Sequence, residues 1–350
     1  MPGKPQPTIQ SLLRQAAPKL RPKKITCAED RDLGRLEAEL LLGHVLGMDR
    51  VALIAHADRR IGSATIRRFD ALIRRRLRHE PISQITGTKG FYGRDFSVTK
   101  NVLTPRPETE LLIELALSLC HPRAGGDPAS RSRNPDSRLH GNDTGVVFWD
   151  VGTGSGAIAV TLACETSESP ILATDLSLRA IEMAKHNAKK HGVTKRIRFE
   201  KSDLLQPVAY RWLKKQAAEN NTLIICANLP YLPDSDKKEL EPDVVKFEPS
   251  SALFAGTDGL RLIRKLLGQL ARHLPEWGYK KTTMLFEFDP PQSQVLLSLA
   301  QSLFPNASSV EILRDLAERD RILKISLTAP AGPTSVKSPR GSGGALSARR

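Results

Sequence analysis

Val146-Val147-Phe148-Trp149-Asp150-Val151-Gly152-Thr153-Gly154-Ser155-Gly156 is the stretch of sequence that decides the fold. Residues 146–151 form a short apolar run typical of a buried parallel strand, and residues 157–163, which follow the glycines, are typical of a helix. Glycines between a strand and a helix let the backbone turn tightly and approach a ligand closely. Gly152, Gly154 and Ala157 satisfy the dinucleotide-binding pattern G-x-G-x-x-A. This loop alone therefore does not distinguish a dinucleotide from another nucleoside cofactor.

Polar residues follow further apolar runs downstream, at the strand ends where open α/β sheets bind their ligands. Asp175 comes directly after the run 171–174. At this position a carboxylate would hold the ribose hydroxyls of a dinucleotide or of another nucleoside cofactor. Ser202-Asp203-Leu204-Leu205 follows a strand expected over residues 196–201, and we assign Asp203 and Leu204 to the adenine side of the same site. These strand ends predict a nucleoside-binding edge of a parallel sheet.

Asn228-Leu229-Pro230-Tyr231 follows a fourth apolar run, residues 223–227, and indicates the chemistry. An amide or amino-purine nitrogen is a poor nucleophile because its lone pair is delocalised. The Asn228 side-chain oxygen and the main-chain carbonyl beside it can each accept one N–H bond from such a nitrogen, and Tyr231 can stack on the flat group. The alternative is an ordinary turn, in which Asn and Pro are present only because both residues are common in turns. Together, the four strand ends resemble an S-adenosylmethionine-dependent methyltransferase rather than an NAD enzyme.

Segments outside these strand ends make the resemblance more specific. They are His79-Glu80-Pro81-Ile82-Ser83-Gln84-Ile85-Thr86-Gly87, Phe91-Tyr92-Gly93, Leu103-Thr104-Pro105-Arg106-Pro107-Glu108-Thr109-Glu110, Phe247-Glu248-Pro249-Ser250-Ser251-Ala252-Leu253, Gly256-Thr257-Asp258-Gly259-Leu260, Arg314-Asp315-Leu316 and Asp320-Arg321. With them the chain resembles the protein-(glutamine-N5) methyltransferases over most of residues 8–327, and within that family the peptide chain release factor glutamine methyltransferases. Residues 105–110 are the most specific piece.

The resemblance implies a Rossmann-like α/β domain of seven strands, mostly parallel with one reversed, preceded by a small helical domain. It implies transfer of a methyl group from S-adenosylmethionine to a glutamine side chain in the Gly-Gly-Gln loop of a release factor. The cofactor would be bound by Gly152, Thr153, Gly154, Ser155, Gly156, Asp175, Asp203, Leu204 and Asn228. The substrate would be bound by Asn228, Leu229, Pro230 and Tyr231, with Asn228, Pro230 and Tyr231 as the catalytic residues.

Leu229 is the one departure from the family's Asn-Pro-Pro-Tyr motif. A carbonyl is retained at this position, but the fixed φ of proline and the restriction it places on Asn228 are lost. Asn-Leu-Pro-Tyr is also typical of ribosomal RNA adenine dimethyltransferases. Three alternatives therefore stay open: a ribosomal-protein glutamine methyltransferase, an RNA or DNA adenine-N6 methyltransferase, and an inactive module that binds the cofactor.

Composition agrees with an intracellular enzyme of 350 residues with formal net charge +15. Arginine runs at 59–60, 67–68 and 74–76 form either a solvated surface or a basic platform for a ribosomal protein or RNA. The eight histidines and four cysteines (Cys27, Cys120, Cys164, Cys226) show no ligand spacing, so we expect no metal. No apolar run approaches the ~20 residues of a membrane span. We expect a cytoplasmic monomer without membrane contact.

The chain divides into four expected parts. We predict that residues 1–85 form a helical substrate-recognition domain, with helices over 9–20, 36–46 and 66–77. We predict that residues 86–104 form a hairpin connector and that residues 105–328 form the methyltransferase domain. The first element of that domain is expected to be a helix over 105–120. Residues 121–145, rich in Gly, Pro, Arg and Ser, predict a disordered insertion, and residues 329–350 predict a disordered basic tail.

Overall fold

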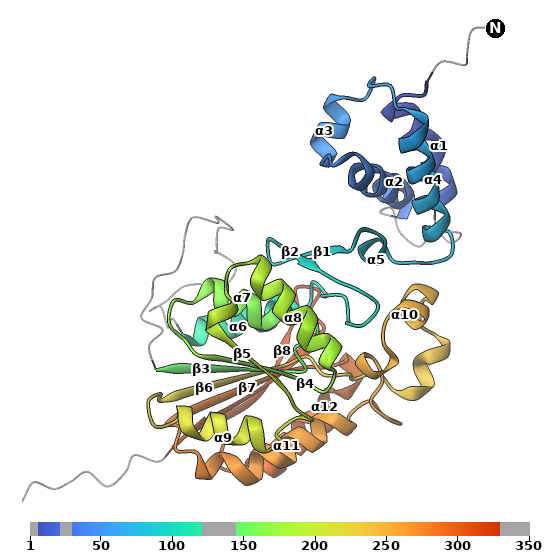
Figure 1. The fold of residues 1–350 in the computed structure, drawn as a ribbon. Coiled ribbons are helices and arrows are strands. Elements are labelled where there is room, and N and C mark those ends of the chain that lie inside the picture. The colour runs from blue at the N-terminus through green and yellow to red at the C-terminus, as the bar shows by residue number, and fades with distance from the viewer. Residues whose placement is uncertain (1–5, 22–29, 121–144, 330–350) are drawn as a thin grey trace, which may run out of the picture.

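The computed structural model describes residues 6–21, 30–120 and 145–329 (Figure 1). Five helices come first within these described residues: α1 (Ile9–Leu20), α2 (Asp30–Leu46), α3 (Arg50–Ala55), α4 (Ser63–Arg76) and α5 (Ile82–Thr86). Helix α1 begins with a capping box between Thr8 and Ser11, which satisfies backbone groups that a helix start leaves unpaired. Ile9, Leu41 and Phe69 are fully or almost fully buried in a hydrophobic core that these helices share among themselves. In Figure 1 helices α1 to α4 stand apart from the sheet.

A short hairpin joins these helices to the rest of the chain. Strands β1 (Thr88–Phe91) and β2 (Arg94–Ser97) pair antiparallel, and the turn between them holds Tyr92 and Gly93 at positive φ. Helix α6 (Thr109–Cys120) follows. The predicted helix start at residue 105 is wrong, because Pro107 disfavours a helical backbone at Arg106 and the helix begins only after the second proline.

The sheet has seven strands: β3 (Val146–Val151), β4 (Ile171–Asp175), β5 (Ile197–Lys201), β6 (Thr222–Ala227), β7 (Lys281–Glu287), β8 (Ser309–Arg314) and β9 (Asp320–Thr328). Their order is β5-β4-β3-β6-β7-β9-β8. Strand β9 runs antiparallel to both of its neighbours, and every other pairing is parallel. This confirms the predicted sheet of seven mostly parallel strands with one reversed.

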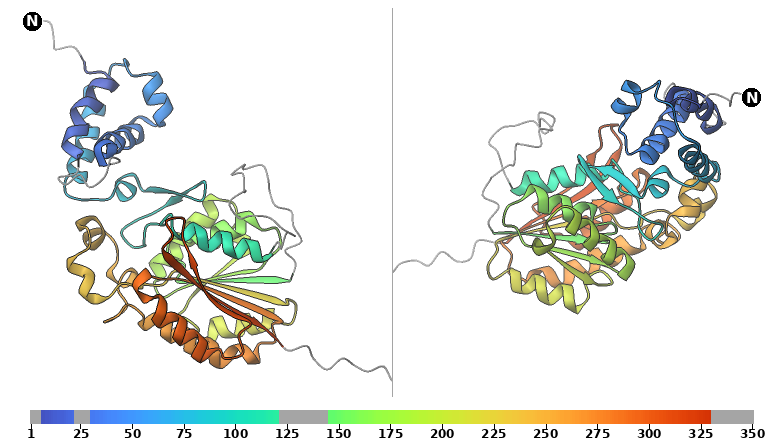
Figure 2. Two further views of the ribbon diagram at one scale, coloured as in Figure 1. Left: turned by 180° about the vertical axis from the view of Figure 1, so that it is seen from behind. Right: turned by 45° about the horizontal axis from the view of Figure 1, so that its top comes forward.

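Helices cover both faces of the sheet (Figures 1 and 2). Helices α6, α7 (Ala157–Glu165) and α8 (Leu178–Lys190) lie on one face, and α9 (Pro207–Gln216), α11 (Arg261–His273) and α12 (Ser293–Leu303) lie on the other. Strand β3 serves both layers, because Val146 and Phe148 belong to one hydrophobic cluster and Val147 and Trp149 to the other. That burial on both faces explains its continuous apolar sequence.

The short helix α10 (Pro242–Phe247) meets the N-terminal helices. Arg76 Nη1 lies 2.6 Å from Asp243 Oδ2, and the same guanidinium lies 2.9 Å from Glu37. Gln84 Nε2 donates to the Phe247 carbonyl at 2.5 Å. These contacts tie the helical part to the segment that follows Tyr231 in the domain that contains the seven-stranded sheet.

Two predicted segments lie almost wholly outside the described residues. Of the predicted insertion 121–145 the structure describes only Gly145, and of the predicted tail 329–350 only Ala329. Within the described parts of the chain, no helix has the length and apolarity to cross a membrane. Among these same residues, no group of three or more His, Cys, Asp or Glu side chains is arranged to hold a metal ion.

Candidate active site

The glycine-rich loop between β3 and α7 depends on three glycines that have positive φ. Gly152, Gly154 and Gly156 have φ values of 75°, 55° and 82°, a region that other residues enter only with strain. Asp175 braces this loop: its Oδ2 accepts from Gly154 N at 3.0 Å and its Oδ1 accepts from Ser177 N at 2.8 Å. Burial raises the pKa of the Asp175 carboxyl. The loop and the predicted ribose carboxylate are therefore one hydrogen-bonded unit.

Asp150, the last polar residue of β3, holds the other end of the loop. Its Oδ2 accepts from Thr153 Oγ1 at 2.6 Å and from Ala159 N at 3.1 Å. Its Oδ1 is buried and has no hydrogen-bond partner among the residues that the structure describes. Burial raises the pKa of Asp150 to about 7. Sequence reasoning read this residue only as part of a strand.

Asp203 and Leu204, assigned to the adenine side, lie after β5. Asp203 Oδ2 forms an ion pair with Lys265 Nζ of α11 at 2.6 Å, at a partly exposed position. Leu204 is buried and has a φ of 56°, unusual for a residue with a side chain. The Leu205 backbone N–H donates to Gln269 Oε1 at 3.2 Å, so α11 fixes this turn.

The tetrapeptide after β6 meets residues from α6 and β7. Asn228 Nδ2 donates to Thr109 Oγ1 at 2.9 Å, and Thr109 Oγ1 donates to Glu287 Oε2 at 2.7 Å. Tyr231 Oη donates to the second carboxylate oxygen, Glu287 Oε1, at 3.3 Å. Within the described part of the chain, Asn228 Oδ1 makes no hydrogen bond. Glu287 is only 1% exposed, and burial raises the pKa values of Glu287 and Tyr231.

The loop 256–260 supports Tyr231 from the other side. Gln292 Nε2 donates to the Tyr231 carbonyl at 2.7 Å and to the Asp258 carbonyl at 2.9 Å. Gly259 has a φ of 74°, and a Cβ at this position would stand 1.9 Å from the Tyr231 carbonyl oxygen. Only glycine fits there, so the backbone of this loop packs directly against the backbone of residues 228–231.

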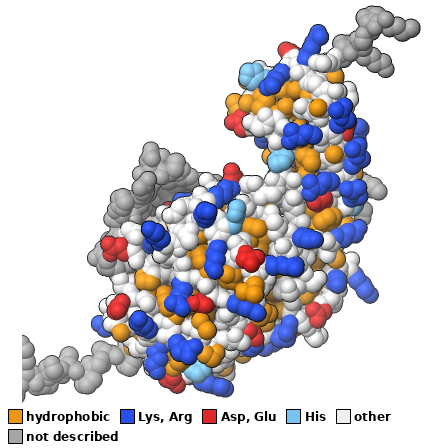
Figure 3. Space-filling model, viewed as in Figure 1, with side chains coloured by type: hydrophobic (Ala, Val, Ile, Leu, Met, Phe, Trp, Pro, Cys, Tyr) orange, Lys and Arg blue, Asp and Glu red, His pale blue; other side chains and the backbone are white. Residues whose placement is uncertain are grey.

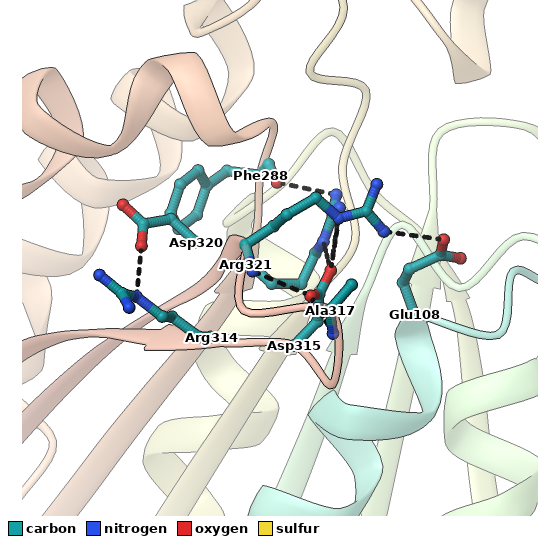
Figure 4. Close-up of polar contacts among 8 residues, drawn as sticks. Glu108, Phe288, Arg314, Asp315, Ala317, Asp320 and Arg321 are labelled. Atoms are coloured by element: carbon teal, nitrogen blue, oxygen red, sulfur yellow. Dashed lines mark hydrogen bonds and ion pairs between the residues drawn. The ribbon is translucent and has the colours of Figure 1, made fainter.

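Figure 4 shows a cluster of charges at the turn between β8 and β9, next to the start of α6. Asp315 Oδ2 receives Arg321 Nη2 at 3.3 Å, while Arg321 Nη1 donates to the Phe288 carbonyl at 3.4 Å. Arg319 Nη2 lies 3.9 Å from Glu108 Oε1. The Arg321 charge favours the ionised form of Glu287 and so opposes the effect of burial on the pKa of that carboxyl. The Arg-Asp-Leu and Asp-Arg motifs thus place the Arg321 charge near Glu287 and hold Arg321 through Asp315.

Two family models match the chain. The model of the PrmC N-terminal domain covers residues 11–87, and a methyltransferase domain model covers residues 142–241. The chain is 35% identical over 316 residues to the release factor glutamine methyltransferase of Nitratidesulfovibrio vulgaris, an alignment that covers 90% of this chain and 94% of the relative. The chain belongs to the release factor glutamine methyltransferase family. The family member of Staphylococcus aureus is 33% identical over 299 residues, covering 85% of this chain and 95% of the relative.

A second group of relatives is longer. The bifunctional methyltransferase of Rickettsia conorii is 38% identical over 261 residues, which are 73% of this chain and 47% of that protein. The chain therefore spans about half the length of this relative. The family resemblance drawn from the sequence motifs is confirmed by the first group.

Besides Asp150, the sequence did not point to Thr109 and Glu287 as residues of the candidate site. Thr109 lies inside the most specific family segment, residues 105–110, and Glu287 stands at the carboxyl end of a parallel strand. Both positions carried a signal, since that edge of a sheet is where ligands bind. Neither could be joined to Asn228 without the fold.

Proposed function

We propose that this chain transfers a methyl group from S-adenosylmethionine to the side-chain amide nitrogen of a glutamine in the Gly-Gly-Gln loop of a peptide chain release factor. The observation that carries the proposal is the orientation of Asn228. Its amide nitrogen is engaged by Thr109, while its oxygen stays available at the ligand-binding edge of the sheet. An acceptor in that position suits a substrate that offers an N–H. The names of relatives that match almost full length point to the same substrate.

The residues present fit the cofactor. Of the three positive-φ glycines, Gly154 has the most open surroundings, since the nearest atom to a Cβ placed there would be 3.9 Å away, and its N–H donates to Asp175. The Asp175 carboxylate accepts from the backbone N–H groups of residues 154, 176 and 177, and with about four lone-pair sites it retains capacity for a ribose hydroxyl. When bound, the cofactor supplies an electrophilic methyl group on a positively charged sulfur.

The chain's own residues position the nucleophile. Asn228 Oδ1 and the carbonyl of Leu229 accept one N–H bond each from the substrate amide and hold its nitrogen for an in-line displacement. Tyr231 forms one wall of the slot that receives the substrate amide. Glu287 fixes the Tyr231 hydroxyl and Gln292 fixes the Tyr231 carbonyl. No strong base is required, because positioning and exclusion of water lower the barrier.

We further propose that residues 1–85 recognise the substrate protein. A cleft of about 930 Å³ lies between α2, the hairpin and α10, and it is lined by residues that include Arg76, Arg106 and Glu248. Arg75 and Arg76 form ion pairs with acidic residues, whereas the exposed Arg67, Arg68 and Arg74 remain candidates for contact with an acidic partner. Figure 3 shows Lys and Arg side chains over this part of the molecule. The proposal includes a cytoplasmic monomer acting in translation termination.

A second candidate is adenine-N6 methylation of RNA. It is favoured by the Asn-Leu-Pro-Tyr form of the motif and by the net charge of +15. The test is to incubate the protein with methyl-labelled S-adenosylmethionine and, in separate reactions, release factor, ribosomal proteins and ribosomal RNA. We expect label in the release factor. Label in ribosomal RNA alone would reject the proposal and establish the second candidate.

A further inference from the structure

The hydrogen bonds around Glu287 have only one consistent direction when its carboxylate is ionised. A carboxylate can only accept, and its two oxygens lie 2.7 Å from Thr109 Oγ1 and 3.3 Å from Tyr231 Oη. The single hydroxyl proton of Thr109 is therefore committed to Glu287. Only lone pairs remain on Thr109 for Asn228, which must then present its NH2 group at 2.9 Å and turn its oxygen away.

We infer that Thr109 and Glu287 are positioning residues that set the polarity of the methyl-acceptor slot. Through them the Asn228 carboxamide is held with its oxygen toward the substrate, so the slot accepts an N–H and disfavours a carboxylate, which has no hydrogen to donate. This inference rests on the proposed function, since it assigns the device that selects a substrate amide.

The three residues come from separate elements, which gives the device its rigidity. Thr109 is the first residue of α6, Glu287 is the last residue of β7, and Asn228 directly follows β6. Thr109 is 4% exposed and Glu287 is 1% exposed, so bulk water does not compete for these hydrogen bonds. Without the Thr109 hydroxyl, the Asn228 carboxamide could turn over and offer an NH2 group to the substrate, which would repel the substrate's own N–H.

The test compares four variants in methyl transfer to release factor: Thr109→Val, Thr109→Ser, Glu287→Gln and the control Thr161→Val. Valine has nearly the shape of threonine but can neither donate nor accept. Thr161 is also buried, on α7, and its hydroxyl has no hydrogen-bond partner among the described residues. Each variant is measured for kcat, substrate KM, cofactor Kd and Tm.

We expect Thr109→Val to lower kcat about 10- to 100-fold, the loss of one buried hydrogen bond at the reacting group, with cofactor Kd unchanged. Thr109→Ser should restore kcat, and Thr161→Val should match wild type. Glu287→Gln should also lower kcat, because its NH2 group can donate to Thr109 and free the Thr109 proton for the Asn228 oxygen.

A Thr109→Val enzyme with wild-type kcat would overturn the inference, and so would a Thr109→Ser enzyme as slow as the valine variant. If Thr109→Val does not fold, Glu287→Gln decides, and a wild-type kcat there overturns the inference. The proposed function fails in a different way, when wild type methylates an adenine amino group instead. The same variants can then be run on that substrate, which also offers an N–H.

Discussion

Leu229 Cδ2 lies 2.9 Å from the point where a Cβ on Gly152 would stand. Leu229 is the residue that replaces the first proline of the family motif, and its side chain is only 4% exposed. The departure from the motif therefore packs against the glycine-rich loop and belongs to the hydrophobic core below it. The proposed cofactor loop and the proposed acceptor loop are in direct contact through this pair.

Gly152→Ala should lower Tm and weaken cofactor binding, because the new methyl group collides with Leu229 and the residue has a φ of 75°. Gly192→Ala is the matched control, since Gly192 has a φ of 74° but open space around the position of a Cβ. Both variants share a backbone cost of about 1–2 kcal/mol. Thermal denaturation and calorimetry should show the larger effect at Gly152. Equal effects would mean that the contact with Leu229 is easily relieved.

Leu229→Pro should lower Tm while kcat of the folded enzyme is retained or raised. Proline keeps the carbonyl and fixes φ, but it fills less of the buried space that the leucine side chain occupies. Thermal denaturation and steady-state kinetics on release factor measure the two effects separately. Loss of kcat with wild-type cofactor affinity would show that the loop is shaped for a substrate other than a glutamine amide.

Asp175→Asn should raise the cofactor Kd about tenfold or more, because charge-assisted hydrogen bonds to the ribose contribute ~1.5–3 kcal/mol each. Calorimetry on folded protein measures the effect. Glu200→Gln is a suitable control, since Glu200 lies on the neighbouring strand β5 and pairs with Arg198. A Kd equal to that of wild type would reject the assignment of Asp175 to the ribose.

Asp150→Asn should remove a pH dependence of stability. The folded-state pKa of Asp150, about 7, lies above its ordinary value of 3.8, so the folded protein binds the extra proton between these values. Stability from this group is present at low pH and is lost as pH rises toward and through about 7. Urea denaturation at about pH 5 and about pH 8 should measure the free energy of unfolding of both proteins. Relative to wild type, the free energy of unfolding of the variant should be higher at the higher pH. The same difference at both pH values would contradict the buried neutral state.

The sequence predicted the sheet well because buried parallel strands leave a local signal. The runs 146–151 and 223–227 coincide with β3 and most of β6, and glycines that require positive φ marked the loop between β3 and α7. The start of α6 was misplaced because two prolines interrupt what looked like one helix. Thr109 and Asn228 are 119 positions apart, and Thr109 and Glu287 are 178 apart. Local patterns cannot reveal hydrogen bonds of that range.

Leu229 shows the same limit at a single residue. The motif alone presents it as a lost proline, which is a statement about backbone freedom. Its burial against Gly152 follows from the packing of β3 beside β6, whose registers align Val151 with Ala227. A side chain's environment is a property of the assembled sheet.

The most direct test of the central claim is to map the methylated residue by mass spectrometry after reaction with release factor. Wild-type protein should methylate the glutamine of the Gly-Gly-Gln loop at its side-chain nitrogen. Asn228→Ala should bind the cofactor but lose about 10²–10³ in rate, as expected when a contact made in the transition state is removed. Methylation of a different residue, or wild-type turnover by Asn228→Ala, would contradict the account.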